Sequence, residues 1–443
     1  MIEVNGHLSA PIDINRGVRQ GDPLSALLFI ISIEPMIKNI QNCVQIKSLV
    51  GRKVIGYADD LICMTKTSSL ETFFDVVQSF CDISSLELNK SKCKIISHKR
   101  KHSKVFKHLG INYDLNLPNS DKISEVELVK MKHKYVMPKM SYRGKAIVMD
   151  VFIVSQVVFK ARNQNFSPQY IASSQKIITN GLWNDGFHDI NEKILTLPTT
   201  LGGVGLPDIS LKIATAKLID YRNILCDKND LELSSFLINA INMKNDENVA
   251  GDLKFFKRIK IDVIYASVDG IDIRYCDERY SIEQNTKSAE LYFFMIKHKS
   301  VLAEQRLIKS EQRFGISIKD LICFSKFLWS SKSLKAYQKN ILYRLLYLGT
   351  KDRLWLFSKG LRDSPKCIFC NAHNETFEHL FFNCSFLSSL VGVARPKCWN
   401  EIFDKNNLIA HSFVCIIIMA SWTESSAEAF EKLEDLKTIL RCK

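Results

Sequence analysis

Two stretches decide the fold: RGVRQGDPLS at residues 16–25 and YADD at residues 57–60. In the first, Asp22 and Pro23 are typical of a helix start, because Asp is a favoured N-cap and Pro fits the first helical position. Apolar residues then recur at helical spacing as far as Ile31. Pro35 is expected to break or restart this helix, since Pro cannot donate the helical hydrogen bond.

The second stretch is predicted to be the tip of a hairpin. β-like residues 53–57 and 61–65 flank Ala58, Asp59 and Asp60, which predict a tight turn. Two adjacent carboxylates at a turn repel each other, and a compensating cation stabilises them. Mg²⁺ is the natural candidate, because carboxylate oxygens are its preferred ligands. An ordinary acidic turn is the alternative, since Asp is a favoured turn residue.

Cysteine and histidine concentrate in one segment downstream. Cys367, Cys370, His379 and Cys384 follow the spacing C-x2-C-x8-H-x4-C. Three thiolates and an imidazole form the tetrahedral ligand set of a structural Zn²⁺, and no position is left open for catalysis. His373 is an alternative imidazole ligand. Buried cysteines beside a chance histidine are the alternative to a metal site.

Composition sets the class of protein. The chain has 443 residues, 46% of them hydrophobic, and a net charge of +14, which excludes a collagen-like or wholly disordered chain and fits a polyanionic partner. The cysteines are mostly single, as in a reduced intracellular protein. The start is not a signal peptide, and the longest apolar runs, residues 24–33 and 413–422, are too short to span a bilayer. We therefore expect an intracellular protein with no membrane partner.

Together the two opening stretches closely resemble the reverse transcriptases of LINE, or non-LTR, retrotransposons. The resemblance implies that Asp59 and Asp60 are catalytic and hold Mg²⁺ in a two-metal site. It also implies nucleotide or template contacts for residues of both motifs: Arg16, Gly17, Gln20, Gly21 and Tyr57. The residue types agree with these roles, because glycine lets backbone approach a ligand and glutamine offers both a donor and an acceptor.

The next palm segments resemble the family in the same order. LNKSK at residues 88–92 resembles a palm motif whose lysine lies near the incoming triphosphate, and Lys92 is the better match to that lysine. FKHLG at residues 106–110 resembles a strand turn that supports the primer terminus. The resemblance therefore assigns primer support to three residues: Phe106, Leu109 and Gly110.

Later segments resemble the family more loosely. MSYRGK at residues 140–145 is similar to a thumb segment, and ETFEHLF at residues 375–381 matches the signature between the family's zinc-binding cysteines. GGVGLPD at residues 202–208 is also similar to a family element, and we interpret it as a structural turn. Basic residues cluster over residues 90–107 and 130–145, where either phosphate contact or a solvated charged face is a reasonable interpretation.

The expected fold class is α+β. A partial reverse transcriptase palm, an antiparallel sheet with helices, is followed by a mainly helical thumb and connection region and a small Cys/His zinc module. The predicted boundaries are residues 1–115 for the palm, 116–330 for the thumb and connection, 331–395 for the zinc-binding region and 396–443 for a helical tail. Within these, residues 225–330 carry no motif that indicates a function.

The resemblance implies an RNA-directed DNA polymerase, a nuclear nucleotidyltransferase that uses an RNA template, a DNA primer or target, and deoxynucleoside triphosphates. The family's palm also uses a metal-binding Asp well upstream of the first motif, and Glu3 and Asp13 lie too close to Gln20 for that position. We therefore expect an incomplete two-metal site, in a truncated reading frame or the carboxy-terminal part of an element. The alternative function is a catalytically inactive nucleic-acid-binding remnant that retains the thumb and zinc module.

Overall fold

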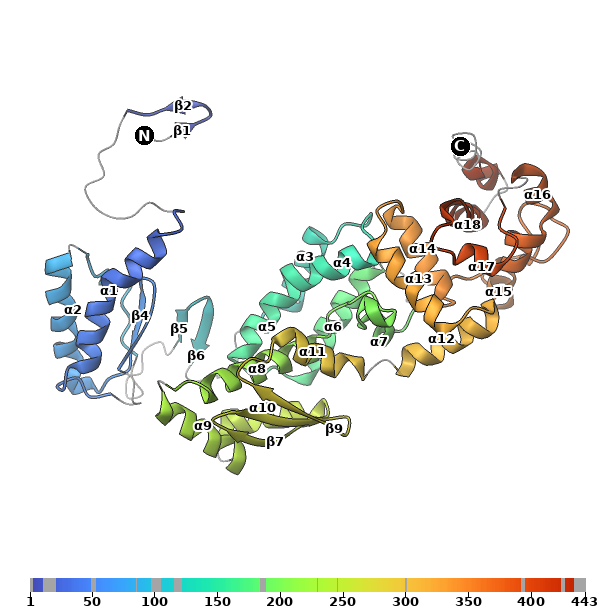
Figure 1. The fold of residues 1–443 in the computed structure, drawn as a ribbon. Helices are drawn as coiled ribbons and strands as arrows, with labels where there is room; N and C mark the ends of the chain where they lie inside the picture. The colour runs from blue at the N-terminus through green and yellow to red at the C-terminus, as the bar shows by residue number, and fades with distance from the viewer. Residues whose placement is uncertain are drawn as a thin grey trace. The chain divides into compact units, whose positions relative to one another are not determined.

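Figure 1 shows the chain as a computed structural model. The structure describes residues 3–10, 21–48, 53–84, 86–96, 105–114, 122–183, 189–228, 230–244, 246–298, 301–391, 395–423 and 427–433. The chain divides into two compact units, Met1–Ser120 and Asp121–Lys443.

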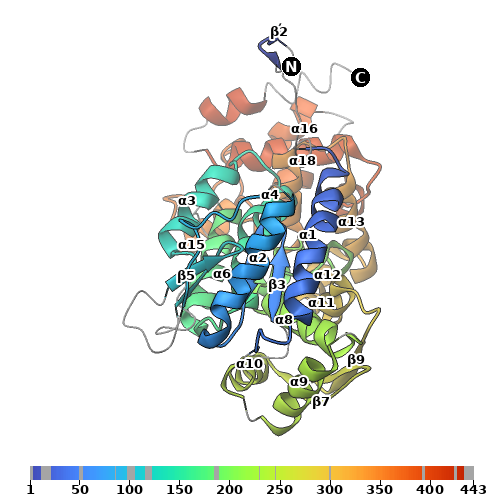
Figure 2. The ribbon, with the colours of Figure 1, turned by 90° about the vertical axis from the view of Figure 1, so that its left-hand side faces the viewer.

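The first unit is built on a β-hairpin covered by two helices. β3 (Val54–Tyr57) pairs antiparallel with β4 (Asp60–Cys63), so the predicted hairpin is confirmed. α1 (Ser25–Asn42) and α2 (Leu70–Ser84) lie side by side against the same face of this hairpin (Figure 1 and Figure 2). Apolar side chains at helical spacing meet the hairpin in a small core, which contains Met36, Ile40, Ile46, Val54, Val77 and Cys81.

The helix α1 differs from its prediction at its start and at its proline. It begins at Ser25 and not at Pro23, although the Asp22 carboxylate still accepts a hydrogen bond from the Leu24 backbone N–H at 2.8 Å. Pro35 lies inside the helix and does not end it, so the predicted break was wrong. Proline removes one helical hydrogen bond, but Ile33, two residues before it, and Met36, directly after it, are both buried and hold the two halves in one helix.

A second antiparallel hairpin consists of β5 (Val105–His108) and β6 (Ile111–Asp114). Leu109 and Gly110 form its two-residue turn with φ values of 47° and 82°, the left-handed conformations of a tight hairpin turn. β1 (Glu3–Val4) pairs with β2 (His7–Leu8) in a further short hairpin.

The second unit is mainly helical, as predicted, and its larger core joins segments from both ends of the unit. The helices that contribute to this core are α3 (Glu125–Tyr135), α4 (Tyr142–Met149), α5 (Ser155–Arg162), α6 (Pro168–Leu182), α7 (Glu192–Leu195), the first turn of α8 (Ile209–Leu225), α12 (Val301–Phe314), α13 (Ile318–Ser330), α14 (Ala336–Leu346), α16 (Ser385–Val391), α17 (Trp399–Ile402) and α18 (Leu408–Ser421). A π-helical segment, Asp150–Val154, joins α4 to α5, and a short helix, α15 (Arg353–Ser358), follows α14.

The smaller core of this unit lies against a three-stranded antiparallel sheet that the sequence did not predict. Its strands, in spatial order, are β7 (Ile261–Ser267), β8 (Gly270–Tyr275) and β9 (Glu278–Glu283). The helices that share this core are α8 (Ile209–Leu225), α9 (Leu231–Met243), α10 (Glu247–Arg258) and α11 (Ser288–Lys297), and Figure 1 shows α9 and α10 beside the sheet. A bulge between Val263 and Tyr265 interrupts the alternation of β7, whereas β8 alternates regularly between buried and exposed residues.

The glycine-rich segment at residues 202–208 is a packed turn, as the sequence predicted. The Gly202 carbonyl oxygen accepts hydrogen bonds from the hydroxyls of Tyr343 at 3.0 Å and Tyr347 at 2.8 Å. At Gly203, a Cβ atom would lie only 1.9 Å from the Leu197 carbonyl oxygen. These glycines therefore allow a close backbone approach inside the core, and the turn has no space for a phosphate.

Within the described part of the chain, no helix combines the length and the apolar character that a membrane span requires. The longest of the described helices, α1, has 18 residues. A division of the second unit at residues 330 and 395 stays a prediction.

Replacing Gly203 with alanine is expected to destabilise the second unit by roughly 3 kcal/mol or more, because the Cβ would meet backbone that cannot move aside. Gly315→Ala is the matched control. Nothing lies within 4 Å of its Cβ position, so only its left-handed backbone, at φ 65°, should cost about 1 kcal/mol. Chemical denaturation measures both losses, and equal losses would contradict the packing argument.

His411 should make the second unit less stable as the pH falls. Burial lowers the pKa of His411 to about 4, against 6.5 for the unfolded chain, so the folded protein binds this proton less readily than the unfolded one. Its contribution to stability is therefore complete above pH 6.5 and is lost between pH 6.5 and pH 4, by about 3 kcal/mol in total. His411→Leu should flatten this slope in denaturation measured across the pH range, and an unchanged slope would contradict the assignment.

Candidate catalytic hairpin and metal centre

The tip of the β3–β4 hairpin carries the two predicted catalytic carboxylates. Tyr57 pairs with Asp60 as the last pair of the ladder, which leaves Ala58 and Asp59 as a two-residue turn. Ala58 has a φ of 49°, a left-handed conformation that an alanine adopts only under constraint from the turn. Both Asp59 and Asp60 are exposed. The structure thus brings these carboxylates together at an accessible, tightly turned point of the chain.

The hairpin is fixed from one side by α1. A Cβ on Gly56 would lie 2.9 Å from Ile37 Cδ1 and 3.1 Å from Leu61 Cδ2, so the glycine allows the helix to seat closely against the strand. Alternation along the strand directs the neighbouring side chains to the other face, and Tyr57 is 65% exposed there. The core of the first unit therefore holds the backbone of the tip while leaving the tip itself open.

The other residues predicted for the nucleotide and template fall in two groups. Arg16, Gly17 and Gln20 lie outside the described residues. Gly21 is exposed with a φ of 94°, which only glycine adopts readily. Lys92 is exposed in a turn in which the Asn89 side chain accepts a hydrogen bond from the Lys92 backbone N–H at 3.2 Å.

The residues predicted for primer support form the β5–β6 hairpin. The rings of Phe106 and Tyr113 are stacked across the strand pair with centroids 5.1 Å apart. Leu109 is 39% exposed at the turn, next to Gly110. The hairpin therefore presents an apolar, aromatic surface and a turn with no bulky polar group.

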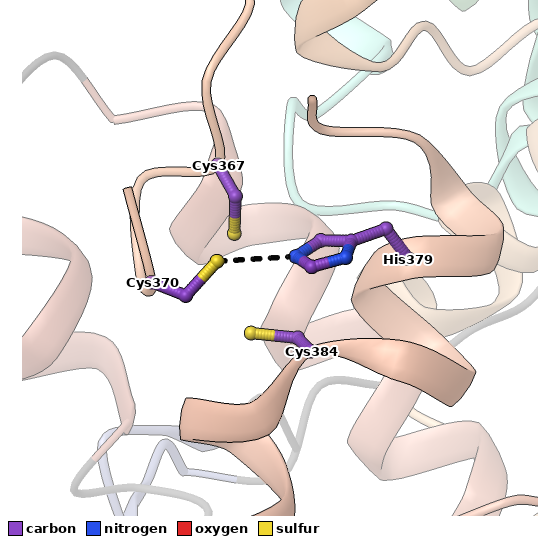
Figure 3. A group of neighbouring side chains, drawn as sticks. All are labelled: Cys367, Cys370, His379 and Cys384. Atoms are coloured by element: carbon purple, nitrogen blue, oxygen red, sulfur yellow. Dashed lines mark hydrogen bonds between the residues drawn. The ribbon is translucent and has the colours of Figure 1, made fainter. Parts of the chain in front are cut away.

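Downstream, the structure gathers the predicted cysteines and histidine into one cluster. Cys367 and Cys370 come from a loop, whereas His379 begins a π-helical segment, His379–Asn383, and Cys384 follows it. Figure 3 shows the four side chains pointing toward one another. Their ligating atoms all lie within 4.8 Å of one another, and Cys370 Sγ is 3.3 Å from His379 Nε2. Within the described residues this is the one group of three or more such side chains.

Burial distinguishes the two candidate imidazole ligands, His379 and His373. Cys367, Cys384 and His379 are buried, whereas His373 is exposed. The His373 carbonyl oxygen accepts from the Cys367 backbone N–H at 2.8 Å, and the His373 ring lies beside the His379 ring with centroids 5.4 Å apart. The Cys367 thiol donates a hydrogen bond to Cys384, which lowers the pKa of Cys384 to about 5 and raises the pKa of Cys367. The cluster therefore contains His379 and already favours a thiolate.

Arg395 holds the half of the cluster that carries His379 and Cys384. Its guanidinium donates to the carbonyl oxygens of Phe381 at 2.6 Å, Cys384 at 3.0 Å and Leu380 at 3.2 Å. Leu380 and Phe381 lie among the last residues of the π-helical segment, whose carbonyls lack partners within the helix. The Cys384 carbonyl also accepts from the Ser388 backbone N–H at 3.0 Å. Nothing in the sequence indicates this role, because Arg395 lies beyond the Cys/His pattern.

Glu375 holds the half of the cluster that carries the C-x2-C loop. The carboxylate is 1% exposed and accepts a hydrogen bond from the Ile368 backbone N–H at 3.2 Å, directly after Cys367. Burial raises the pKa of Glu375 to about 7, although Arg353, 3.7 Å away, opposes the shift. Glu375 belongs to the ETFEHLF segment, so the sequence did contain a signal for it.

The aromatic residues of the module are part of its core. Phe369, Phe377 and Phe381 are at most 6% exposed and belong to the larger core of the second unit. These buried rings therefore build the core of the module and are not accessible for stacking on bases.

Two of the basic residues in the 130–145 cluster are also structural. Lys145 is 1% exposed and donates to the Leu182 carbonyl oxygen at 2.9 Å, and Lys132 is 6% exposed. A buried ammonium group cannot contact phosphate, so the interpretation of the cluster as a phosphate-binding surface is wrong for Lys132 and Lys145. Lys130, Lys134 and Lys139 are exposed.

Comparison with known proteins agrees with both sites. Residues 1–113 match the reverse transcriptase (RNA-dependent DNA polymerase) family, and residues 307–390 match the family described as zinc-binding in reverse transcriptase. The transposon TX1 uncharacterized 149 kDa protein of Xenopus laevis is 28% identical over 254 residues, which cover 51% of this chain and 19% of that protein. The retrovirus-related Pol polyprotein from type-2 retrotransposable element R2DM of Drosophila melanogaster is 22% identical over 298 residues, which cover 58% of this chain and 28% of that protein.

The chain therefore contains a reverse transcriptase segment that carries an aspartate hairpin, and a zinc-binding segment that carries a Cys/His cluster. In both segments it is similar to the reverse transcriptases of non-LTR retrotransposons, the LINE type. It spans about a fifth of the length of the first of these curated relatives and about a quarter of the second.

Proposed function

We propose that this chain takes part in RNA-directed DNA synthesis by two-metal nucleotidyl transfer. The observation that carries the proposal is the exposed pair Asp59 and Asp60 at a constrained hairpin tip, within a segment that matches the reverse transcriptase family. Two carboxylates at one point offer the oxygen ligands that Mg²⁺ prefers. Bound Mg²⁺ would activate the attacking 3′-oxygen and neutralise charge on the leaving pyrophosphate.

The residues around the tip bind and orient the substrates in this proposal. Tyr57 offers an exposed ring beside the carboxylates, and Lys92 offers an exposed ammonium group to a triphosphate. The open backbone at Gly21, with Arg16, Gly17 and Gln20 of the same motif, contacts the nucleotide and template. Phe106, Leu109 and Gly110 support the primer terminus through the apolar surface of the β5–β6 hairpin.

The partners in this proposal are an RNA template, a DNA primer or target, and deoxynucleoside triphosphates, and the expected compartment is the nucleus. Retrotransposable elements are named in several relatives, including one of Popillia japonica that is 32% identical over 96 residues, or 21% of this chain and 14% of that protein. Because the chain covers only part of these longer relatives, reverse transcription by this chain is proposed and not taken over from them.

We further propose that Cys367, Cys370, His379 and Cys384 hold one structural Zn²⁺. Three sulfurs and one imidazole nitrogen, mutually within 4.8 Å, have the chemistry and the spacing of a tetrahedral zinc site, in which the ligands lie about 2.0–2.3 Å from the metal. All four positions would be filled by protein, so the metal would join the loop to the π-helical segment without a catalytic role.

Asp59→Ala should abolish primer extension on an RNA template in the presence of Mg²⁺, by at least about a hundredfold, because one metal ligand is removed. Asp75→Ala, an exposed carboxylate on α2 in the same unit, is the matched control and should extend the primer normally. Gel analysis of a labelled primer gives both rates.

Two outcomes would contradict the catalytic proposal: extension that is unchanged in Asp59→Ala, or no extension by a folded, zinc-loaded wild-type chain. The second outcome would favour the alternative, a nucleic-acid-binding remnant that retains the thumb and the zinc module.

Arg395→Ala should weaken zinc binding by about tenfold or more, because it frees the carbonyls that fix the turn between His379 and Cys384. Arg395→Lys should restore part of the affinity, since an ammonium group can bond one of these carbonyls. Arg362→Ala is the control, because Arg362 donates to the Trp422 carbonyl oxygen at 3.0 Å and does not contact the ligand turn.

Competition with a chromophoric chelator measures these affinities. Wild type should hold one zinc per chain, and a Cys367→Ser/Cys370→Ser variant should hold none. An Arg395→Ala variant with wild-type affinity would show that the carbonyl contacts do not position the ligands.

A further inference from the structure

A groove lies in the second unit among α6, α8, α10 and the loop that joins α5 to α6. It consists of two adjoining cavities of about 250 Å³ and 280 Å³. Four residues line both cavities: Pro168, Ile171, Phe255 and Arg258. We call this feature the α6–α10 groove. It lies in residues 161–259, outside the two segments that match known families.

The walls of the groove are held by specific contacts. Lys217 of α8 and Asp252 of α10 form a buried ion pair at 2.7 Å, and the Tyr221 hydroxyl donates to the same carboxylate at 2.5 Å. At the preceding residue of α10, Gly251, a Cβ atom would lie 2.7 Å from Asn165 Nδ2, so glycine lets the α5–α6 loop come close to α10. The groove is therefore a fixed feature of this packing.

The rim of the groove is basic. Residues 254–260, KFFKRIK, contain four basic side chains and no acidic one, and Lys254 and Arg258 line the groove. Both are exposed, and within the described residues neither takes part in an ion pair. An uncompensated pair of cations at a cavity mouth favours an anionic ligand.

The charges that line the two cavities differ. Glu192 and Asp208 line the first cavity and keep their negative charges, because their hydrogen-bond donors, the Thr179 hydroxyl and the Leu211 backbone N–H, are neutral. The second cavity is lined by Lys217, Lys254 and Arg258 and by no carboxylate. Asp252 pairs with Lys217, so the positive charge at the second cavity comes from Lys254 and Arg258.

The interior of the groove suits an unpaired base. Phe166 and Phe255 contribute aromatic surface, while Gln164 and Asn165 contribute side-chain amides at the same cavity. Aromatic rings stack on bases of any sequence, and amides can bond the base edges that pairing would otherwise occupy. A base in a duplex is stacked and paired and cannot enter such a cavity, so the chemistry favours a single strand.

We propose that the α6–α10 groove binds single-stranded nucleic acid, with Lys254 and Arg258 against the phosphodiester backbone and one unpaired base in the cavity lined by Phe166 and Phe255. The proposal rests on the proposed function for the class of ligand, and it adds a binding site separate from the aspartate hairpin. DNA and RNA share the backbone and base chemistry on which it depends.

The test is fluorescence anisotropy of the full chain with labelled single-stranded DNA and RNA over a series of salt concentrations. Lys254→Ala/Arg258→Ala should weaken binding about tenfold and reduce the salt slope by roughly 1.4, as expected for two lost phosphate contacts at about 0.7 each. Lys309→Ala/Lys319→Ala is the matched control, because it removes two exposed charges from α12 and α13 and leaves the groove intact. The control should change affinity less than twofold.

A second arm tests the base. Abasic strands should bind wild type about tenfold more weakly, in line with roughly 1–3 kcal/mol for stacking one base, and a duplex should compete poorly. Photocrosslinking of a strand that carries 4-thiouridine, with mass spectrometry of the adduct, should map to the groove. Equal losses in the groove and control variants, or crosslinks only elsewhere, would overturn the proposal.

The outcomes separate this site from the catalytic proposal. If primer extension fails in wild type while the groove variant still loses single-strand binding, the groove is supported and the polymerase is not. If extension depends on Asp59 but the groove variant binds as wild type does, the groove proposal alone fails.

Discussion

Buried backbone carbonyls must find hydrogen-bond donors, and in this chain long side chains from distant segments supply them. The Gly202 carbonyl accepts hydrogen bonds from two tyrosine hydroxyls, one within α14 and one at its C-terminal end. The Leu182 carbonyl accepts one from the Lys145 ammonium group. Arg222 donates to the carbonyls that follow β9, and Arg395 donates to those that end the π-helical segment of the metal cluster. The turns that join the helices of the second unit, and the ligand geometry, depend on these contacts.

This use of lysine and arginine changes what the net charge of +14 means. Lys132, Lys145, Lys217 and Arg222 are all buried, so part of the basic content stabilises the fold and does not face a polyanion. The charge that remains for nucleic acid is therefore unevenly distributed. The stretch at residues 254–260 contributes to this remaining charge, because Lys254 and Arg258 are exposed at the rim of a cavity. Lys132 and Lys145 do not contribute to it, although they lie in the basic cluster over residues 130–145.

Local spacing explains which features could be predicted from the sequence. The β3–β4 hairpin and the Cys/His cluster depend on residues close together in the chain, and both are present with the expected members. The sheet β7–β9 was missed because its strands are only six or seven residues long and a bulge breaks the alternation of β7, although β8 alternates regularly. Pro35 was misjudged because burial on both sides of it keeps α1 continuous. The role of Arg395 depends on which carbonyls the fold brings to it, and no pattern in the sequence records that.

The two sites use burial in opposite ways, and this difference agrees with their proposed roles. Asp59 and Asp60 are exposed at a turn whose backbone is constrained, which suits ions that must also contact an incoming substrate. Cys367, His379 and Cys384 are buried and flanked by Arg395 and Glu375, which suits an ion that contacts protein alone. The proposed catalytic role requires exchange of ligands with solvent at the first site, whereas such exchange would loosen the fold at the second. Exposure of the hairpin tip is therefore what the proposed role demands, and the core formed by α1 and α2 provides rigidity without covering it.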